Sequence, residues 1–96
     1  MNYKIRTGIV HRMIAGEHFL ISSGDAAGIC PAIQQINDGG AYYWELLEQG
    51  NHTEQMLDLA AAEYGVDKET LRPGLKRFLD GLEERKYILR DENTQE

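Results

Sequence analysis

The spacing of apolar residues changes near residue 37, and this change constrains the fold more than any other feature of the sequence. Before it, residues 8–14 (GIVHRMI) and 17–23 (EHFLISS) are rich in β-branched and apolar residues, as strands are. The Ala-Gly pair between them suits a two-residue hairpin turn. Residues 29–36 (ICPAIQQI) follow a short loop and predict a third strand. Pro31 cannot donate a hydrogen bond to a neighbouring strand, so this strand is expected at the edge of the sheet.

After residue 37, three segments carry apolar residues at helical spacing. Tyr43 and Trp44 lie on the apolar stripe of the first segment, so Trp44 is expected in the core rather than at a ligand. The third segment contains Pro73, so its helix is expected either to kink there or to begin near Arg72. The expected N-caps and helix stops are, in chain order, Asn37 and Gly50, Thr53 and Gly65, and Asp67.

The order of the predicted elements is three strands followed by three helices. Residues 86–90 (KYILR) then predict a short closing strand or an extended tail. A chain of 96 residues, 42% of them hydrophobic, has the length of one domain with one compact core. We expect that domain to cover residues 1–96, with its core between residues 8 and 90 and a polar tail at 91–96.

The net charge and the cysteine content limit the classes of partner expected for this protein and the cellular compartment that it suits. The formal net charge is −6, from 16 acidic against 10 basic residues. A strongly acidic chain is a poor nucleic-acid binder unless its basic residues cluster on one face. Cys30 is the single cysteine, so an internal disulfide is impossible, which fits a reducing cytoplasm. The sequence has no apolar run near the 20 or so residues that a membrane span requires, so no membrane association is expected.

Few residues carry signs of catalytic chemistry. The histidines lack the spacing of metal ligands, and phosphate-binding and nucleophile motifs are missing. Cys30 has no marked base partner, so it is expected to pack as a buried thiol. We therefore expect no enzymatic activity, no metal and no cofactor. Arg72, Lys76 and Arg77 cluster on one predicted helix, where they form either a solvated face or a ligand contact.

The segment from residue 36 to residue 50 (INDGGAYYWELLEQG) carries an ordered set of features: an apolar residue followed by Asn, then Gly, Trp and a closing Leu-Leu-x-x-Gly. The segments AAEYGVD and LKRFLDGLEERKYI follow it. Together they resemble the PqqD-like family, the small peptide-recognition proteins of ribosomal peptide-modifying pathways. The resemblance covers residues 8–90.

The resemblance implies a winged-helix-like α+β fold, in which a three-stranded antiparallel sheet is followed by a three-helix bundle. It also implies a non-catalytic function. Such proteins bind the leader region of a precursor peptide as an added strand on the third strand, in a cleft bordered by the third helix. They present the peptide to a modifying enzyme, often a radical S-adenosylmethionine enzyme.

Carried onto this chain, the resemblance implies a peptide-binding site made of the third strand and the third helix. Apolar leader residues are expected beside Leu75 and Leu79, while Arg72 and Lys76 would steer acidic leader residues. The expected strand residues are Ala32, Ile33, Gln34, Gln35 and Ile36.

The chain departs from the usual family pattern at several positions. Gly39 and Gly40 replace a commoner acid-Thr-Gly run, and Pro31 and Pro73 border the expected cleft. Gly40 precedes Trp44 by one turn, so the missing side chain is expected to let the helix approach the sheet. Gly39 has no such physical explanation.

Two questions stay open at this point. The alternative to peptide binding is a winged-helix DNA-binding regulator, against which the acidic charge argues. The oligomeric state is either a monomer or a dimer formed by strand edges or domain swapping, because an exposed edge strand permits both.

Overall fold

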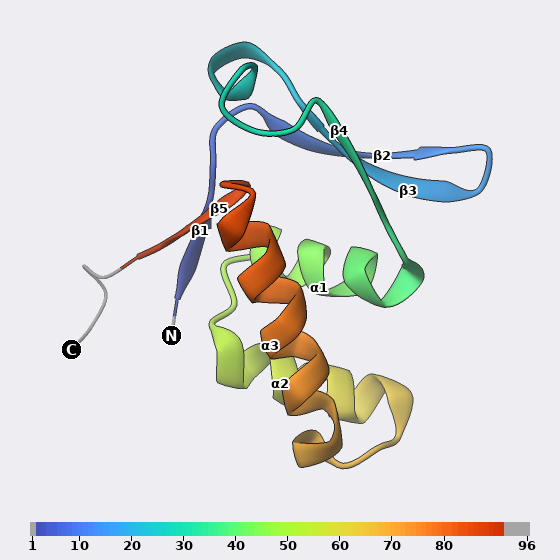
Figure 1. The fold of residues 1–96 in the computed structure, drawn as a ribbon. Coiled ribbons are helices and arrows are strands. Elements are labelled where there is room, and N and C mark those ends of the chain that lie inside the picture. Colours follow the sequence, from blue (N-terminus) through green and yellow to red (C-terminus); the bar gives the residue numbers. More distant parts are fainter. Residues whose placement is uncertain (1, 92–96) are drawn as a thin grey trace.

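In the computed structural model, which describes residues 2–91, the chain forms two small sheets and three α-helices (Figure 1). The polar tail expected at 91–96 lies outside the described residues, apart from Asp91. The elements are, in chain order, β1 (Tyr3–Ile5), β2 (Ile9–Ile14), β3 (Glu17–Ser22), the 3-10 helix η1 (Gly24–Ala26), β4 (Ile33–Ile36), α1 (Asp38–Glu48), α2 (Thr53–Tyr64), α3 (Lys68–Glu84) and β5 (Ile88–Arg90).

The larger sheet has the strand order β2-β3-β4, and all its pairs are antiparallel. The hairpin turn between β2 and β3 falls at Ala15 and Gly16, which both have positive φ angles. The predicted edge position of the third strand is confirmed, since β4 pairs only with β3 among residues 2–91. Figure 1 shows the three helices on one side of this sheet.

The third strand is shorter than predicted and begins only at Ile33. The amides of Ile29 and Cys30 both donate to the carbonyl of Ala26, which curls the chain before Pro31. The Pro31 carbonyl then accepts a hydrogen bond from the Tyr87 hydroxyl at 3.0 Å. The extended conformation of β4 therefore begins only beyond the residues that make these contacts.

A second sheet, β1 with β5, joins the two ends of the described chain. The closing strand was predicted, but its partner β1 was not. The strands are antiparallel, with Ile5 opposite Ile88 and Tyr3 opposite Arg90. Three residues of strand give too short a pattern to predict, because period-2 alternation needs about four or more residues to be recognised.

Side chains cap all three helices. Asn37 accepts the amide of Gly40 at 2.7 Å, as predicted. Asp67 accepts the amide of Glu69, also as predicted. The second cap was wrongly predicted: His52, not Thr53, is the N-cap, and it forms a capping box with Gln55.

Pro73 lies inside α3, which runs without interruption from Lys68 to Glu84. The alternative in which the regular helix begins near Arg72 is therefore wrong. Proline lacks the N–H that would bond to the carbonyl four residues earlier, here that of Glu69. The Asp67 cap and the contacts of Leu75 in the core hold the helix on either side of this gap.

Trp44 is fully buried in a core shared by the larger sheet and the helices, as predicted. Its indole N–H donates to a carboxylate oxygen of Glu48 at 2.9 Å, so burial leaves no unpaired donor on the ring. Cys30 is also buried, and its thiol donates to the Lys86 carbonyl at 3.2 Å. This is the packed thiol that the sequence predicted.

Candidate functional site

The open edge of β4 carries backbone groups without strand partners in the described chain. The amide of Ser22 donates to the carbonyl of Ala32 directly opposite it, at 3.0 Å. In an antiparallel pair such bonded positions alternate with unbonded ones. The backbone groups of Gln34 and Ile36 therefore point to β3, whereas those of Ile33 and Gln35 point to the open edge.

The side chains of β4 alternate between the two faces of the sheet. Gln34 lies opposite the fully buried Leu20, so Gln34 and Ile36 face the helices. Ile33 and Gln35 face outward and are exposed. The side-chain amide of Gln34 donates to the Gln35 carbonyl at 3.1 Å and so occupies one acceptor of the open edge.

A groove separates this edge from α3. One wall is formed by β4 and the residue that follows it, and the other wall by one face of α3. The lining residues are Gln34, Gln35, Ile36 and Asn37 on the first wall, and Arg77, Phe78, Gly81, Leu82 and Arg85 on the second. The groove thus combines an open strand edge with an apolar strip flanked by two arginines.

Phe78 is held in place by the first turn of α1. A Cβ added to Gly40 would lie 2.9 Å from Cε1 of Phe78 and 3.4 Å from Cβ of Ile36. The missing side chain therefore lets α1 approach α3 as well as the sheet, which extends the prediction made for Gly40. The rings of Phe78 and Tyr43 also pack together, with centroids 6.0 Å apart.

Gly81 keeps the α3 wall open. It lies inside the helix, where glycine costs about 1 kcal/mol relative to alanine. A Cβ there would meet only the guanidinium of Arg85, at 3.1 Å. Close packing of the core does not require this glycine, and its effect is to let the Arg85 guanidinium lie against the helix at this point of the wall.

Two arginines supply the charge of the groove. Arg77 and Arg85 line it, no carboxylate does, and neither arginine has an ion pair among residues 2–91. The Arg85 guanidinium donates to the Gly81 carbonyl of its own helix at 3.1 Å. Both side chains are exposed and can turn toward a bound group.

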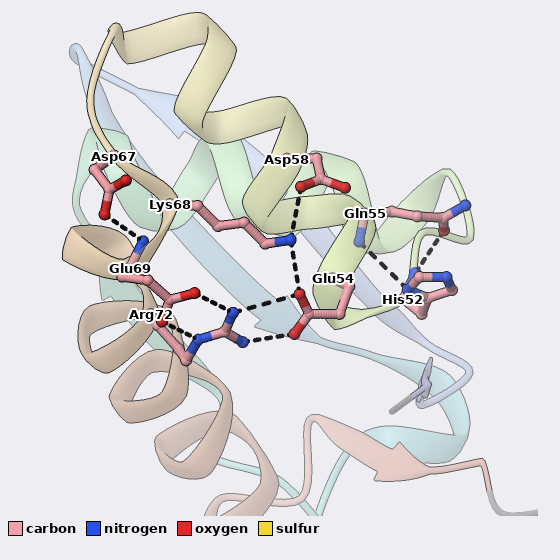
Figure 2. A network of polar contacts seen from close by, with 8 residues as sticks. All are labelled: His52, Glu54, Gln55, Asp58, Asp67, Lys68, Glu69 and Arg72. Atoms are coloured by element: carbon pink, nitrogen blue, oxygen red, sulfur yellow. Dashed lines mark hydrogen bonds and ion pairs between the residues drawn. The ribbon is translucent and has the colours of Figure 1, made fainter.

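The cations predicted for steering, Arg72 and Lys76, lie elsewhere and are already paired. Figure 2 shows Arg72 between Glu54 of α2 and Glu69 of its own helix, with N–O distances of 2.5 and 2.8 Å. Lys76 pairs with Asp80 at 2.8 Å. Their charge is thus neutralised locally, and neither residue lines the groove.

The ion pairs of Arg72 belong to a network that joins α2 to α3. Lys68 contacts both Glu54 and Asp58 at 2.9 Å. Hydrogen bonds from Arg72 and then Lys68 lower the pKa of Glu54 to about 2. The network therefore supports helix packing, and the solvated-face interpretation of Arg72 and Lys76 describes them better than ligand contact.

The predicted apolar anchors need correction too. Leu75 is fully buried and Leu79 is 2% exposed, so neither offers a surface to a peptide. They belong to the buried core, as does Leu82, which borders the groove but is only 3% exposed. Phe78 is the partly exposed apolar side chain of the α3 wall. The five strand residues expected at the site lie at the groove or directly before it.

Sequence reasoning missed the groove face of α3. Its members follow one another at helical spacing. Gly81 is an unfavourable residue inside a helix, but Gly74 on the same helix is equally so, and a glycine alone therefore does not single out the groove face. The sequence pointed to Arg77 only as part of a cation cluster with two possible roles. The residues that it missed are Phe78, Gly81, Leu82 and Arg85.

Within residues 2–91, no cluster of three or more potential metal ligands occurs. No helix in this part of the chain is long and apolar enough to cross a membrane.

Comparisons with known proteins identify the class to which this fold belongs. The family model described as coenzyme PQQ synthesis protein D (PqqD) matches residues 17–88. The chain therefore belongs to the PqqD family, and the predicted resemblance is confirmed.

A solved structure shares the fold as well. The chain is similar to a protein described as "TbiB1 in Complex with the TbiA(beta) Leader Peptide", with a TM-score of 0.73 and 28% sequence identity. The match covers 92% of this chain and 99% of the other. The predicted α+β fold, with its three-stranded antiparallel sheet and three helices, is confirmed by this likeness. A comparison with curated protein sequences gave no significant match.

Proposed function

We propose that the chain binds the leader region of a ribosomally made precursor peptide as an added strand on β4. The observation that carries this proposal is the open edge of β4 beside the groove. Ile33 and Gln35 direct their backbone groups outward there, and such edges accept extended peptides. The similar TbiB1 structure contains a leader peptide, which supports the same class of ligand.

Strand addition would divide the peptide side chains into two sets. One set enters the groove and contacts Phe78, while the backbone pairs with Ile33 and Gln35. The incoming N–H groups compete with the side-chain amide of Gln34 for the Gln35 carbonyl. Leu75 and Leu79 act indirectly, because their burial fixes the position of the helix that forms the second wall.

The outward set of peptide side chains leaves a surface for a second protein. We propose that this partner is the modifying enzyme, a radical S-adenosylmethionine enzyme as the family resemblance implies, and that the chain presents the peptide without catalysis of its own. The proposal places this work in the cytoplasm and assigns it to a single domain spanning the described elements.

Peptide is favoured over duplex DNA by the distribution of charge. Among residues 2–91, carboxylates pair with four of the Lys and Arg side chains: Lys68, Arg72, Lys76 and Arg90. The net charge is −6, and DNA binding requires a basic face that neutralises several phosphates. Two arginines in a groove suit a short peptide better than a duplex.

Isotope-labelled full-length protein, titrated with synthetic leader peptides from precursor genes beside its own gene, tests this proposal. Amide signals of residues 33–36 and of the groove face of α3 should shift at peptide concentrations near the micromolar range, which corresponds to roughly 8 kcal/mol. Shifts confined to another surface, such as the exposed Leu59 and Val66, would reject strand addition.

A further inference from the structure

Arg77 and Arg85 line the groove, and neither forms an ion pair with an acidic residue among residues 2–91. Arg77 lies on α3 and Arg85, eight residues later, is the C-cap of that helix, which places their Cα atoms about 12 Å apart along the helix axis. Phe78, Gly81 and Leu82 lie between them on the same wall. The order along the wall is therefore cation, apolar strip, cation.

An extended peptide has a matching repeat. Side chains on one face of a strand recur every two residues, about 6.7 Å apart, so residues i and i+4 are separated by about 13 Å. This separation is close to that of the two arginines, and long flexible arginine side chains tolerate an angle between strand and helix. The residue at i+2 then faces the apolar strip, where Gly81 adds no side chain of its own and a turn of the exposed Arg85 side chain toward the peptide opens the space beside it.

We infer that the groove selects leader segments with two acidic side chains four residues apart and an apolar side chain midway between them. This inference rests on the proposed strand addition. Arg77 and Arg85 are its specificity-determining residues, because a carboxylate forms strong, charge-assisted hydrogen bonds with a guanidinium. Gly81 sets the size of the apolar side chain accepted between them.

The net negative charge of the molecule confines the attraction for acidic side chains to the groove. With 16 acidic residues against 10 basic ones, the chain repels acidic peptides at long range. Only a segment seated in the groove brings its carboxylates to Arg77 and Arg85. Other cations of α3 do not compete for them, since Arg72 and Lys76 are held by Glu54 and Asp80.

A display library of random dodecapeptides, panned on the full-length protein, tests the inference without a known ligand. Peptides enriched on the wild type should carry Asp or Glu at i and i+4 around an apolar residue. The same library panned on R77E should replace one of the two acids by Lys or Arg, and on R85E the other. These two variants also fix the direction in which the peptide runs.

Lys4→Glu is the matched control, because it changes the net charge equally but lies on β1, away from the groove. Its enriched peptides should keep both acids. For a representative enriched peptide, replacing both acids by their amides should weaken binding to the wild type about tenfold at 0.15 M salt. Circular dichroism verifies that each variant is folded.

The outcomes separate this inference from the function on which it rests. Enriched peptides that shift the amides of residues 33–36 but carry no paired acids overturn the inference and leave strand addition intact. Enriched peptides that leave those amides unchanged reject strand addition itself. Acid enrichment that survives both arginine reversals also overturns the inference, and failure to enrich any peptide counts against both.

Discussion

Gly40 and Phe78 are in contact across two helices, and the contact leaves no room for a methyl group. A Cβ on Gly40 would lie 2.9 Å from Cε1 of Phe78, closer than carbon atoms approach in proteins. Phe78 in turn lines the groove. The first turn of α1 therefore determines where one groove residue of α3 lies.

Gly40→Ala should push the Phe78 ring out of position. Overpacking costs about 1–3 kcal/mol and the gain in helix propensity is about 1 kcal/mol, so a net loss of up to about 2 kcal/mol is expected. Gly39→Ala is the control, since its Cβ would meet only the Asn37 side chain, at an ordinary 3.7 Å. Urea denaturation should show that variant to be as stable as the wild type or more so. Equal stabilities of the two variants would contradict the packing role of Gly40.

Trp44→Ala should cost about 3–5 kcal/mol in the free energy of unfolding, because it leaves a large cavity in the core. A small domain has about 5–10 kcal/mol in total, so this variant should be largely unfolded or close to it. Thermal melting followed by circular dichroism measures the effect. A melting temperature near that of the wild type would show that Trp44 is not essential to the core.

Gln35→Pro should abolish strand addition while leaving the sheet intact. It removes an N–H that points to the open edge, whereas a proline at Gln34 would remove one that points to β3. Gln35→Ala is the control, because both variants lose the 2.6 Å hydrogen bond from the Gln35 side chain to Glu17. Calorimetry with a binding peptide should give at least about tenfold weaker affinity for the proline variant, equivalent to about 1.4 kcal/mol. Equal affinities would place the peptide elsewhere.

Gly81→Ala and Gly81→Leu should change the stability of the fold and the affinity for peptide in different ways. Alanine raises helix propensity by about 1 kcal/mol, and its Cβ displaces only the mobile end of Arg85. We therefore expect Gly81→Ala to melt at a higher temperature and to bind peptide somewhat more weakly. Gly81→Leu should stay folded and lose binding by about tenfold or more, because its side chain fills the groove. Unchanged binding by the leucine variant would exclude this wall from the site.

The network between α2 and α3 predicts a defined pH dependence. The pKa of Glu54 is lowered from its ordinary 4.5 to about 2, mainly by Arg72 and then Lys68. The resulting stabilisation is complete above pH 4.5 and is lost as the pH falls toward 2. Glu54→Gln should thus melt below the wild type at pH 7, by a small margin because the pairs are exposed.

This margin should close between pH 4.5 and 2. Glu63→Gln, on the same helix but outside the network, should show no such convergence. A margin that persists at pH 2 would mean that Glu54 acts through packing rather than through its charge.

The sequence predicted the elements well because their signals are local. Asn37 and Asp67 cap helices by contacts within three residues, and the apolar stripe containing Trp44 repeats over two turns of α1. The edge position of β4 followed from a single residue, Pro31. These features depend on neighbours in the chain, which a sequence displays directly.

The groove face of α3 could not be predicted in the same way. Phe78 fits an apolar stripe of the helix as well as Leu79 does, and only the packing of α1 and β4 decides which of the two remains accessible. Likewise, the pairing of Arg72 with Glu54 joins residues from different helices. Which cations remain available to a ligand is therefore a property of tertiary structure.

The hydrogen bond from Tyr87 to the Pro31 carbonyl ties the end of α3 to the segment that leads into β4. The carbonyl of Lys86 adds a second tie, since it accepts from both Arg6 and Cys30. These hydrogen bonds fix the two walls of the groove relative to each other in the free protein. The protein should therefore lose little conformational entropy when it binds a peptide. That loss falls on the peptide instead. Leaders already biased toward extended conformations, by β-branched residues for example, should therefore bind with the smallest entropic penalty.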